Sequence, residues 1–443
     1  MSDSAERTRN QSLGSSGDGR QSREGIPTVV VLGTGFAGSS FISTFNREIS
    51  ENAKKAIDLI AVNSRSYMTF SPLLYEVATG KVYGYHISNP ICCTVEDLGY
   101  RFIEADTVEL IPERNEVVTT KGTLHYDRLV IALGSECNDF GIPGVKEHSI
   151  PLKSIKDGEK ARNSVLESYK EAVSRIDDGE AVGSLLTFVV IGGGATGVEL
   201  STSLLEFVDD LNRNHGQRGL MPKVVLVEAQ DKLMKNIDGR FSEELSRIVK
   251  QKGVELLLGR KVVEITGSEV RFSDGSHIQT SNVFWTAGLK TNSVVSTLKM
   301  KLADGSGYRL TVDNFLRVPS LVQVYAIGDS AMPLVKLGEP SVPQTAAAAI
   351  QEGEYLGIKF AQEFNGRHPN IEFKYRDHGT FLSTGRFSGI CRFSHGFILT
   401  GFPAWFLWRF IHLWRISTVR NKFEVLSDWI FSLLHKDIFF DST

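Results

Sequence analysis

The segment TVVVLGTGFAG, residues 28–38, joins an apolar run to a glycine-rich loop. Residues 28–31 are β-branched and predict a strand, and the apolar spacing after the loop predicts a helix. In this strand–turn–helix setting Gly33 permits the tight turn, Gly35 lets backbone approach a pyrophosphate, and Gly38 lets helix pack on strand. The phosphate would meet the N–H groups at the helix start. We therefore predict a dinucleotide site rather than a simple glycine-rich turn.

The stretch FVVIGGGATGVE, residues 188–199, repeats this unit 160 positions later. Its next strand, KVVLVEA, carries Glu228 near its end, where a carboxylate can bond both ribose hydroxyls and repel a 2′-phosphate. The second loop is thus expected to prefer NADH to NADPH. The strand after the first loop, AIDLIAVNS, carries the neutral Asn63 at the corresponding place. An amide can still accept and donate a hydrogen bond there.

Three further strands end in glycine turns that belong to the same architecture. VYAIGDSA, residues 324–331, delivers Gly328 and Asp329, and an acid there can bind a ribityl hydroxyl. YDRLVIALGS ends with Gly134 and Ser135, and NVFWTAGL ends with Gly288 and Leu289. At both turns the chain is expected to pass between two nucleotide domains. Two dinucleotides in one protein imply electron transfer from a mobile nicotinamide to a resident flavin.

Composition limits the other possibilities. A length of 443 residues predicts two or three domains, and a net charge of −3 gives no overall attraction to nucleic acid. The four cysteines show no metal-ligand or disulfide spacing, so no metal is expected and a reducing compartment fits best. No run of 18 apolar residues occurs, which predicts no transmembrane helix. Residues 1–26 are polar and serine- and glycine-rich, as is typical of a disordered tail.

The last part of the chain differs in character from the rest. FPAWFLWRFIHLW and RNKFEVLSDWIF hold Trp405, Trp408, Trp414 and Trp429, and residues 378–423 carry six basic residues and no acid. Such stretches are too short to span a bilayer but suit its interface. A homodimer seam could use the same helices. We expect a peripheral protein at the cytoplasmic face of the cell membrane, and a homodimer.

Taken in order, these motifs, with YMTFSPLLYEVATG and GSECNDFGIPGV, resemble the type II NADH dehydrogenases from about residue 28 to 431. These are single-chain, non-pumping NADH:quinone oxidoreductases of respiratory electron transport. The resemblance implies an α/β fold of two Rossmann-like domains, the second inserted in the first. The expected domains are 27–150 with 300–374 for FAD, 151–299 for NADH, and 375–443 for membrane attachment or dimerisation.

The resemblance also implies site residues. It places FAD at the first loop and NADH at the second, with electrons passing to a quinone. The FAD residues would be Gly33, Gly35, Phe36, Ala37, Gly38, Asn63, Val108 and Asp329, and the NADH residues would be Gly193, Ala195, Thr196, Gly197 and Glu228. We also expect Ser64, Gly134, Ala287, Gly288, Gly328, Ala346 and Ala347 at the cofactor sites.

Two residues are candidates for catalysis. Glu199, in the first turn after the second loop, is linked in the family to proton delivery or nucleotide response, although a helix N-terminus also stabilises an acid. Gln351 could bond a quinone carbonyl or lie on an exposed helix face. The family's AQxAxQ pattern reads here as residues 346–351, AAAAIQ, so that Ala347 replaces a glutamine and Gln351 remains. Asn63 is a second departure, because the family usually has an acid there.

Two other functions stay open on sequence grounds. A sulfide:quinone oxidoreductase shares the fold but needs cysteines beside the flavin, for which only Cys137 and Cys391 can be considered. A slow-turnover NADH sensor at the membrane is compatible with the departure at Ala347. Disulfide reductases are excluded by the missing cysteine pair.

Overall fold

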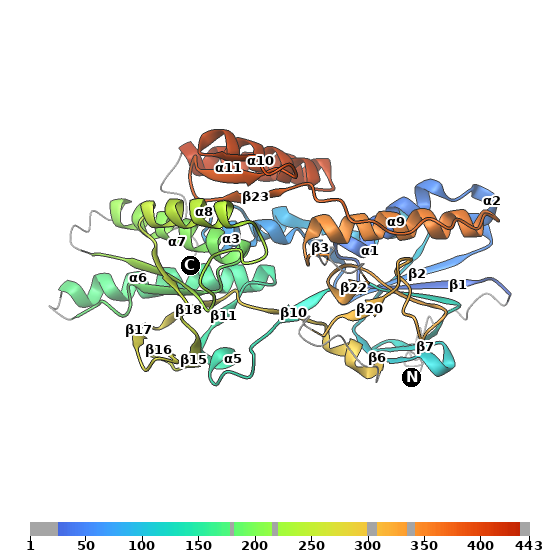
Figure 1. Ribbon diagram of the computed structural model, residues 1–443, viewed down its shortest axis with the longest axis horizontal. Helices are drawn as coiled ribbons and strands as arrows, with labels where there is room; N and C mark the ends of the chain where they lie inside the picture. The colour runs from blue at the N-terminus through green and yellow to red at the C-terminus, as the bar shows by residue number, and fades with distance from the viewer. Residues whose placement is uncertain (1–24, 178–180, 215–219, 299–307, 335–341, 435–443) are drawn as a thin grey trace, which may run out of the picture.

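The computed structural model describes residues 25–177, 181–214, 220–298, 308–334 and 342–434, so the expected N-terminal tail lies almost wholly outside the described residues. Two parallel five-stranded sheets stand side by side, and each is covered by helices (Figure 1). The last helices form a separate layer along one edge of the molecule. This arrangement confirms the expected fold class.

The first sheet has the strand order β21-β9-β1-β2-β5, with all pairs parallel. Its strands are β1 (Thr28–Leu32), β2 (Asp58–Asn63), β5 (Arg101–Glu104), β9 (Arg128–Ile131) and β21 (Val324–Ala326). One face is covered by α1 (Phe36–Glu48) and by α9 (Ala346–Phe364), while α2 (Glu51–Lys55) leads into β2.

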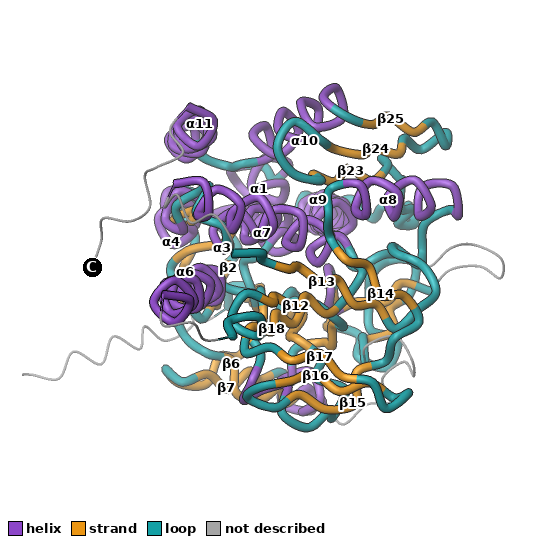
Figure 2. The backbone as a smooth tube through the Cα atoms, turned by 90° about the vertical axis from the view of Figure 1, so that its left-hand side faces the viewer, coloured by secondary structure: helices purple, strands orange, loops and turns teal. Residues whose placement is uncertain are grey.

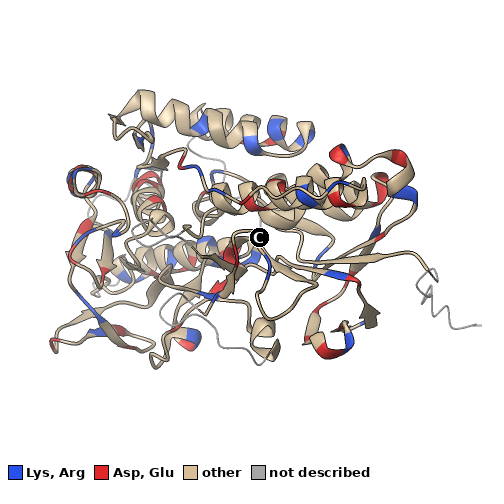
Figure 3. Cartoon of the chain, turned by 45° about the vertical axis from the view of Figure 1, so that its right-hand side comes forward, with Lys and Arg blue, Asp and Glu red and all other residues tan. Residues whose placement is uncertain are grey.

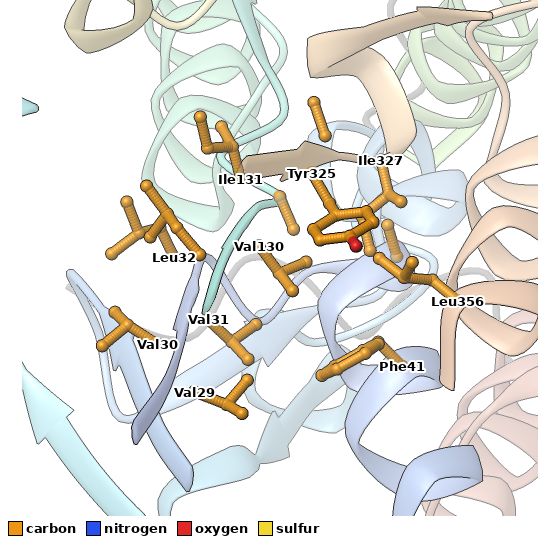
Figure 4. Close-up of a cluster of buried hydrophobic side chains, with 14 of the residues drawn as sticks. Val29, Val30, Val31, Leu32, Phe41, Val130, Ile131, Tyr325, Ile327 and Leu356 are labelled. Atoms are coloured by element: carbon orange, nitrogen blue, oxygen red, sulfur yellow. The ribbon is translucent and has the colours of Figure 1, made fainter. Parts of the chain in front are cut away.

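Close packing of α1 against α9 depends on two glycines. A Cβ at Gly353 would lie 2.3 Å from the carbonyl oxygen of Ala37, and one at Gly357 would lie 2.8 Å from that of Phe41. The two helix backbones therefore touch, and any larger residue would separate them. Around this contact the residues 29–32 of β1 are fully buried, with Phe41, Tyr325 and Leu356 packed beside them (Figure 4).

The other face of the first sheet is covered by an antiparallel sheet of β6 (Thr107–Ile111), β7 (Glu116–Thr119) and β8 (Gly122–His125). Leu110, Val117 and Tyr126 from this side join the same buried cluster. Because both faces are covered, β1 reads as a continuous apolar run instead of an alternating one.

The second sheet repeats the plan in the order β11-β18-β12-β13-β14. Its strands are β11 (Ile150–Pro151), β12 (Thr187–Ile191), β13 (Lys223–Glu228), β14 (Glu255–Leu258) and β18 (Asn282–Trp285). The helices α6 (Ile155–Asp177), α7 (Ala195–Asn214) and α8 (Gly239–Gln251) accompany it, with the antiparallel strands β15 (Val262–Ile265), β16 (Glu269–Phe272) and β17 (His277–Gln279). Like the first unit, the second therefore combines a parallel sheet with helices and a small antiparallel sheet.

The chain crosses between the two units through an antiparallel pair. β10 (Ser135–Cys137) leads out and β19 (Leu289–Thr291) returns, with Cys137 opposite Leu289. Val145 in α5 (Val145–His148) already packs with Val189 in the second core. The second unit is thus inserted in the first, as expected, whereas the exact domain boundaries stay a prediction.

Between β2 and β5 a long excursion reaches toward the second unit. It comprises β3 (Tyr67–Thr69), η1 (Ser71–Leu73), α3 (Leu74–Ala78), η2 (Gly84–Ile87), β4 (Ser88–Pro90) and α4 (Ile91–Asp97). All five residues of α3 are buried, and it packs against the second core, where Leu74 and Val77 join Val165 and Leu204. A short helix buried on every side is positioned by tertiary contacts and not by amphipathic spacing.

The C-terminal layer consists of an antiparallel sheet and two helices. The strands are β23 (Thr380–Ser383), β24 (Gly389–Arg392) and β25 (Ile398–Thr400), and the helices are α10 (Phe402–Arg415) and α11 (Val419–Leu434). Figure 2 shows α10 beside this sheet and α11 as a separate rod. Among the described residues, no helix combines the length and the apolar character that crossing a bilayer requires.

The tryptophans of this layer correct one sequence interpretation. Trp405, Trp408 and Trp429 are at most 6% exposed and belong to the protein interior, and only Trp414 faces outward. The exposed apolar side chains of the two helices are instead mainly phenylalanines and aliphatic residues: Phe402, Phe406, Phe410, Val419, Phe423, Leu426, Ile430, Phe431 and Leu434. We call this set the C-terminal apolar face.

Candidate functional site

The three glycines of the first loop differ in their surroundings as the motif predicts. Gly33 has φ +89°, and a Cβ there would lie 2.3 Å from the Ala132 oxygen. A Cβ at Gly38 would lie 2.0 Å from the Gly33 oxygen, so this glycine allows α1 to approach β1. Gly35 is exposed, and a Cβ added to it would meet no atom within 4 Å. The open space at Gly35 lies at the start of α1, where a pyrophosphate would be held.

The second loop repeats this geometry. Gly192 has φ +115°, and its Cβ would lie 2.8 Å from the Ala287 nitrogen, while a Cβ at Gly197 would lie 1.9 Å from the Gly192 oxygen. Gly194 is exposed and meets nothing within 4 Å. Gly194 was not among the expected site residues, although aligning the two loops in the sequence would have paired it with Gly35. Ala195 and the exposed Thr196 follow at the start of α7.

Each loop is fastened to the end of its second strand. The N–H of Thr34 donates to Asn63 Oδ1 at 3.1 Å, and the N–H of Gly193 donates to Glu228 Oε2 at 2.6 Å. The two hydrogen bonds occupy matching positions. Asn63 accepts through an amide oxygen and Glu228 through a carboxylate oxygen. Asn63 Nδ2 also donates to the Arg65 carbonyl at 2.8 Å, which a carboxylate could not do. The amide of Asn63 therefore makes two hydrogen bonds here, one as acceptor and one as donor.

The turn at Asp329 meets the first loop. Ser135 Oγ donates to Asp329 Oδ2 at 2.6 Å, and Ser330 Oγ donates to the Gly134 oxygen at 3.2 Å. A Cβ at Gly328 would lie 3.0 Å from that of Ala37. The structure thus brings together the first loop, the Gly134 turn and the Asp329 turn at one edge of the first sheet, as expected for carboxyl ends of parallel strands.

Glu352 supports this turn and was not foreseen. Its side chain is 2% exposed and accepts the N–H of Gly328. Burial raises its pKa to about 8, opposed by the Gly328 N–H and by the charge of Arg309. The Arg309 side chain donates to the carbonyls of Ala331 and Val342. No local sequence signal marks Glu352, because its partner Gly328 lies 24 residues earlier in the chain.

Other expected site residues lie around these turns. Ala346 and Ala347 are half-buried at the start of α9, which Thr345 caps. Ser64 is exposed next to Asn63, and Val108 is exposed in β6 at an irregularity of the β6–β7 pairing. Gly288 has φ +69° beside Ala287, and the Phe140 ring lies over it.

The two candidate catalytic residues are placed differently. Both ends of the Gln351 carboxamide bond the backbone of Arg376, at 2.9 and 3.0 Å. Among the hydrogen bonds of the described residues, none joins Gln351 to Glu199. Glu199 is 7% exposed and accepts the Ser383 N–H at 3.1 Å, so it faces the C-terminal layer. Burial, followed by the nearby charge of Glu76, raises the pKa of Glu199 to about 8.

The geometry fits two dinucleotides. Each loop offers an open glycine at the start of a helix and a polar side chain at the neighbouring strand end. Such a pair of sites defines a flavoprotein with two dinucleotide-binding domains. Residues 27–353 match the family model of pyridine nucleotide-disulphide oxidoreductases, and the chain belongs to this family.

Within the family, the relatives narrow the class. The chain is 29% identical to a probable NADH dehydrogenase of Dictyostelium discoideum, over 92% of this chain and 89% of the relative. It is also 29% identical to a mitochondrial internal alternative NAD(P)H-ubiquinone oxidoreductase A1 of Arabidopsis thaliana, over 91% and 83%. The resemblance to type II NADH dehydrogenases is confirmed.

Solved structures agree with this fold. NDH2 of Plasmodium falciparum, in complex with NADH, matches with a TM-score of 0.82 at 20% identity, over 94% of this chain and all of that one. The sulfide:quinone oxidoreductase of Aquifex aeolicus matches with a TM-score of 0.71 at 17% identity, over 93% and 96%. Similarity at these identities concerns the fold alone, so the two activities must be separated by their residues.

Proposed function

We propose that the chain is an FAD-dependent NADH:quinone oxidoreductase that does not pump protons. The observation that carries this proposal is the pair of matching loops, each with an open glycine and a fastened strand end. The relatives named NADH dehydrogenase and NAD(P)H-ubiquinone oxidoreductase support the same donor and acceptor. The flavin, when bound, supplies the hydride acceptor between nicotinamide and quinone.

The residues divide this task. The loop shaped by Gly33 and Gly38 would hold the FAD pyrophosphate at Gly35, and Asp329 would hold the ribityl chain. Gly194 and Thr196 would meet the NADH pyrophosphate, and Glu228 would bond the ribose hydroxyls and exclude a 2′-phosphate. The protein thereby contributes position and electrostatics, while the cofactors supply the redox chemistry.

Cysteine placement argues against sulfide oxidation. Cys391 is fully buried in β24, where its Sγ contacts the Ala404 oxygen at 3.5 Å, and burial raises its pKa to about 12. Burial also raises the pKa of Cys137. Since the thiolate is the reactive form, neither residue is prepared as a nucleophile, and all four cysteines are free.

We further propose that the C-terminal apolar face rests on a membrane surface. Phe402, Phe406 and Phe410 follow one another at helical spacing and are more than half exposed. Lys and Arg residues occur along these helices (Figure 3). Apolar side chains with basic neighbours suit an anionic interface. A second copy of the chain is the other possible occupant of this face. Because the Arabidopsis relative is named mitochondrial, fractionation should compare mitochondrial membranes with the expected cytoplasmic face of the cell membrane.

A donor comparison tests the proposal. Purified protein is assayed for reduction of a soluble ubiquinone analogue with NADH, NADPH or sulfide. We expect turnover with NADH and little with sulfide, and Cys137→Ser should keep the NADH rate. Sulfide-driven turnover that is lost in Cys137→Ser would replace this function with sulfide:quinone oxidoreduction. Flavin bleaching by NADH with negligible quinone turnover would favour the sensor.

A further inference from the structure

Two adjacent cysteines stand at the start of a short surface helix. Cys92 and Cys93 belong to α4, both thiols are free, and Cys93 is exposed while Cys92 is partly buried. Their Sγ atoms lie 3.6 Å apart. The other two cysteines of the chain are Cys137, partly buried in β10, and Cys391, fully buried in β24. The chain thus offers one pair of adjacent thiols, and solvent reaches this pair at Cys93.

Backbone hydrogen bonds hold the start of α4 in place. The N–H groups of Ile91 and Cys92 both donate to the Ser66 carbonyl, at 3.0 and 3.1 Å. The Thr94 hydroxyl donates to the Pro90 carbonyl at 2.9 Å. β3 pairs with β4 immediately before the helix. Because the two thiols project from an ordered backbone, a ligand that bridges them has little chain to immobilise.

The distance between the two sulfurs suits one soft atom bound to both. Two sulfurs at about 2.3 Å from a shared atom, with a bond angle of about 100–110°, lie about 3.5–3.8 Å apart. The observed 3.6 Å falls in this range. A direct disulfide is less suitable, because adjacent Cα atoms are about 3.8 Å apart and disulfides usually need at least about 4.4 Å. The pair is therefore better suited to a bridging atom than to a bond between its own sulfurs.

The surroundings favour an atom that needs only two protein ligands. Within the described part of the chain, no group of three or more His, Cys, Asp or Glu side chains could hold a metal ion. A divalent cation, which usually takes four ligands, would find only the two sulfurs. A trivalent arsenic atom with one organic substituent has two bonds left, and two thiols fill them.

The protonation of the pair points the same way. The hydrogen bond and the charge of Cys92 raise the pKa of the Cys93 thiol, and the acids Glu96 and Asp97 raise it further. Cys93 is therefore a neutral thiol at neutral pH, which makes it a poor nucleophile toward reagents that need a thiolate. A ligand that condenses with neutral thiols has the advantage here.

We propose that Cys92 and Cys93 form a dithiol site that binds monosubstituted trivalent arsenicals. The dihydroxy form of the arsenical condenses with both thiols: two As–O bonds break, two As–S bonds form, and two water molecules leave. Arsenic stays trivalent, so the step needs no oxidant or reductant. This inference does not depend on the proposed function, because neither thiol takes part in electron transfer there.

Uptake of phenylarsine oxide by the purified full-length protein tests the site. Intact mass after removal of excess reagent counts the adducts, and competition with 2,3-dimercaptopropanol measures the affinity. We expect one arsenical per chain. Cys92→Ser and Cys93→Ser should each lower the affinity by at least about a hundredfold, since the second As–S bond forms within one molecule. Cys137→Ser makes the same change at a thiol outside the pair and should leave the affinity unchanged.

A wild-type protein that takes up no arsenical, or a Cys93→Ser variant that binds like the wild type, would overturn the site. Loss of binding in Cys137→Ser would also overturn it, because the adjacent pair would then not suffice. Cys93 is exposed, so Cys93→Ser should melt like the wild type, and this variant decides alone should Cys92→Ser fail to fold. A protein that binds the arsenical but does not reduce quinone refutes the proposed function and supports this site.

Discussion

The carboxylate of Glu228 accepts the backbone N–H of Gly193 at 2.6 Å, and its other oxygen accepts the N–H of Gln230 at 2.8 Å. One side chain therefore fixes the second glycine loop and still presents its remaining lone pairs and its charge at the strand end. The first loop is fixed in the same way by a neutral amide, Asn63. The charge that we propose discriminates between NADH and NADPH is thus held by two backbone hydrogen bonds.

Replacing this charge should relax cofactor choice. In Glu228→Gln one oxygen can still accept from Gly193, but the negative charge opposite a 2′-phosphate is gone. We expect the ratio of kcat/KM for NADPH to that for NADH to rise by about tenfold, which corresponds to about 1.4 kcal/mol. Asp231→Asn, a nearby exchange of an acid for its amide, serves as the control. Equal use of both cofactors by the wild type would remove Glu228 from the ribose site.

Replacing the two outer-facing and inner-facing glycines of the second loop by alanine should have different effects. Substitution of the exposed Gly194 should weaken NADH binding, whereas substitution of the packed Gly197 should lower stability. Gly194→Ala adds a Cβ that meets no protein atom, so the protein should fold normally while the KM for NADH rises at least about threefold. In Gly197→Ala the Cβ would meet the Gly192 oxygen at 1.9 Å, so the thermal midpoint should fall by several degrees. Thermal melts and NADH titrations measure the two effects. A normal KM in Gly194→Ala would mean that no nucleotide approaches this glycine.

The sequence pattern predicted those parts of the fold that neighbouring residues determine. The runs ending at Gly33 and Gly192 specify strand, turn and helix within about a dozen residues, so both loops and both sheets could be anticipated. The bond between Glu76 and Trp429 joins residues 353 positions apart, and no spacing rule announces it. Gln351 is the opposite case. Its residue type suits a quinone ligand, but its carboxamide is hydrogen-bonded to the backbone of Arg376 in the fold.

The faces of α10 show a second limit. Trp405 and Trp408 point into the protein whereas Phe406 and Phe410 point outward, and all four are aromatic. A helix that is apolar on both sides carries no periodic signal that tells the inner face from the outer one. The structure was needed to identify the apolar face, and it shows why deleting both helices would be a poor test of membrane binding: Trp408 and Trp429 would be removed from the core.

Substitutions on that face give a cleaner test. Phe406→Ser, Phe410→Ser and Phe423→Ser together remove three exposed rings and no buried contact. Since an apolar side chain contributes about 1.5–3 kcal/mol when fully buried, the partition onto anionic vesicles should fall by at least about tenfold. Val322→Ser, at an exposed site elsewhere, is the control. Unchanged vesicle binding, together with a shift from dimer to monomer, would make the face a dimer interface.

Glu352 should make stability fall as pH rises. Its pKa is about 8 in the folded protein and 4.5 as the ordinary value, so between these values the folded state binds the proton and the unfolded state releases it. The resulting loss in the free energy of unfolding accumulates from pH 4.5 to 8 and is complete above pH 8. Glu352→Gln should therefore match wild type near pH 5 and melt a few degrees higher near pH 9. Glu354→Gln, exposed on the same helix, should change neither melt. A lower melting point of Glu352→Gln at pH 9 would contradict the assignment.

The central claim is that electrons pass from NADH to a quinone through a flavin held by the first loop. Anaerobic stopped-flow absorbance on the purified protein tests it most directly. One equivalent of NADH should bleach the visible absorption band of the oxidised flavin. One equivalent of ubiquinone analogue should then restore this band at a rate no slower than steady-state turnover. A protein without a bleachable flavin, or a reduced flavin that only oxygen restores, would contradict the account.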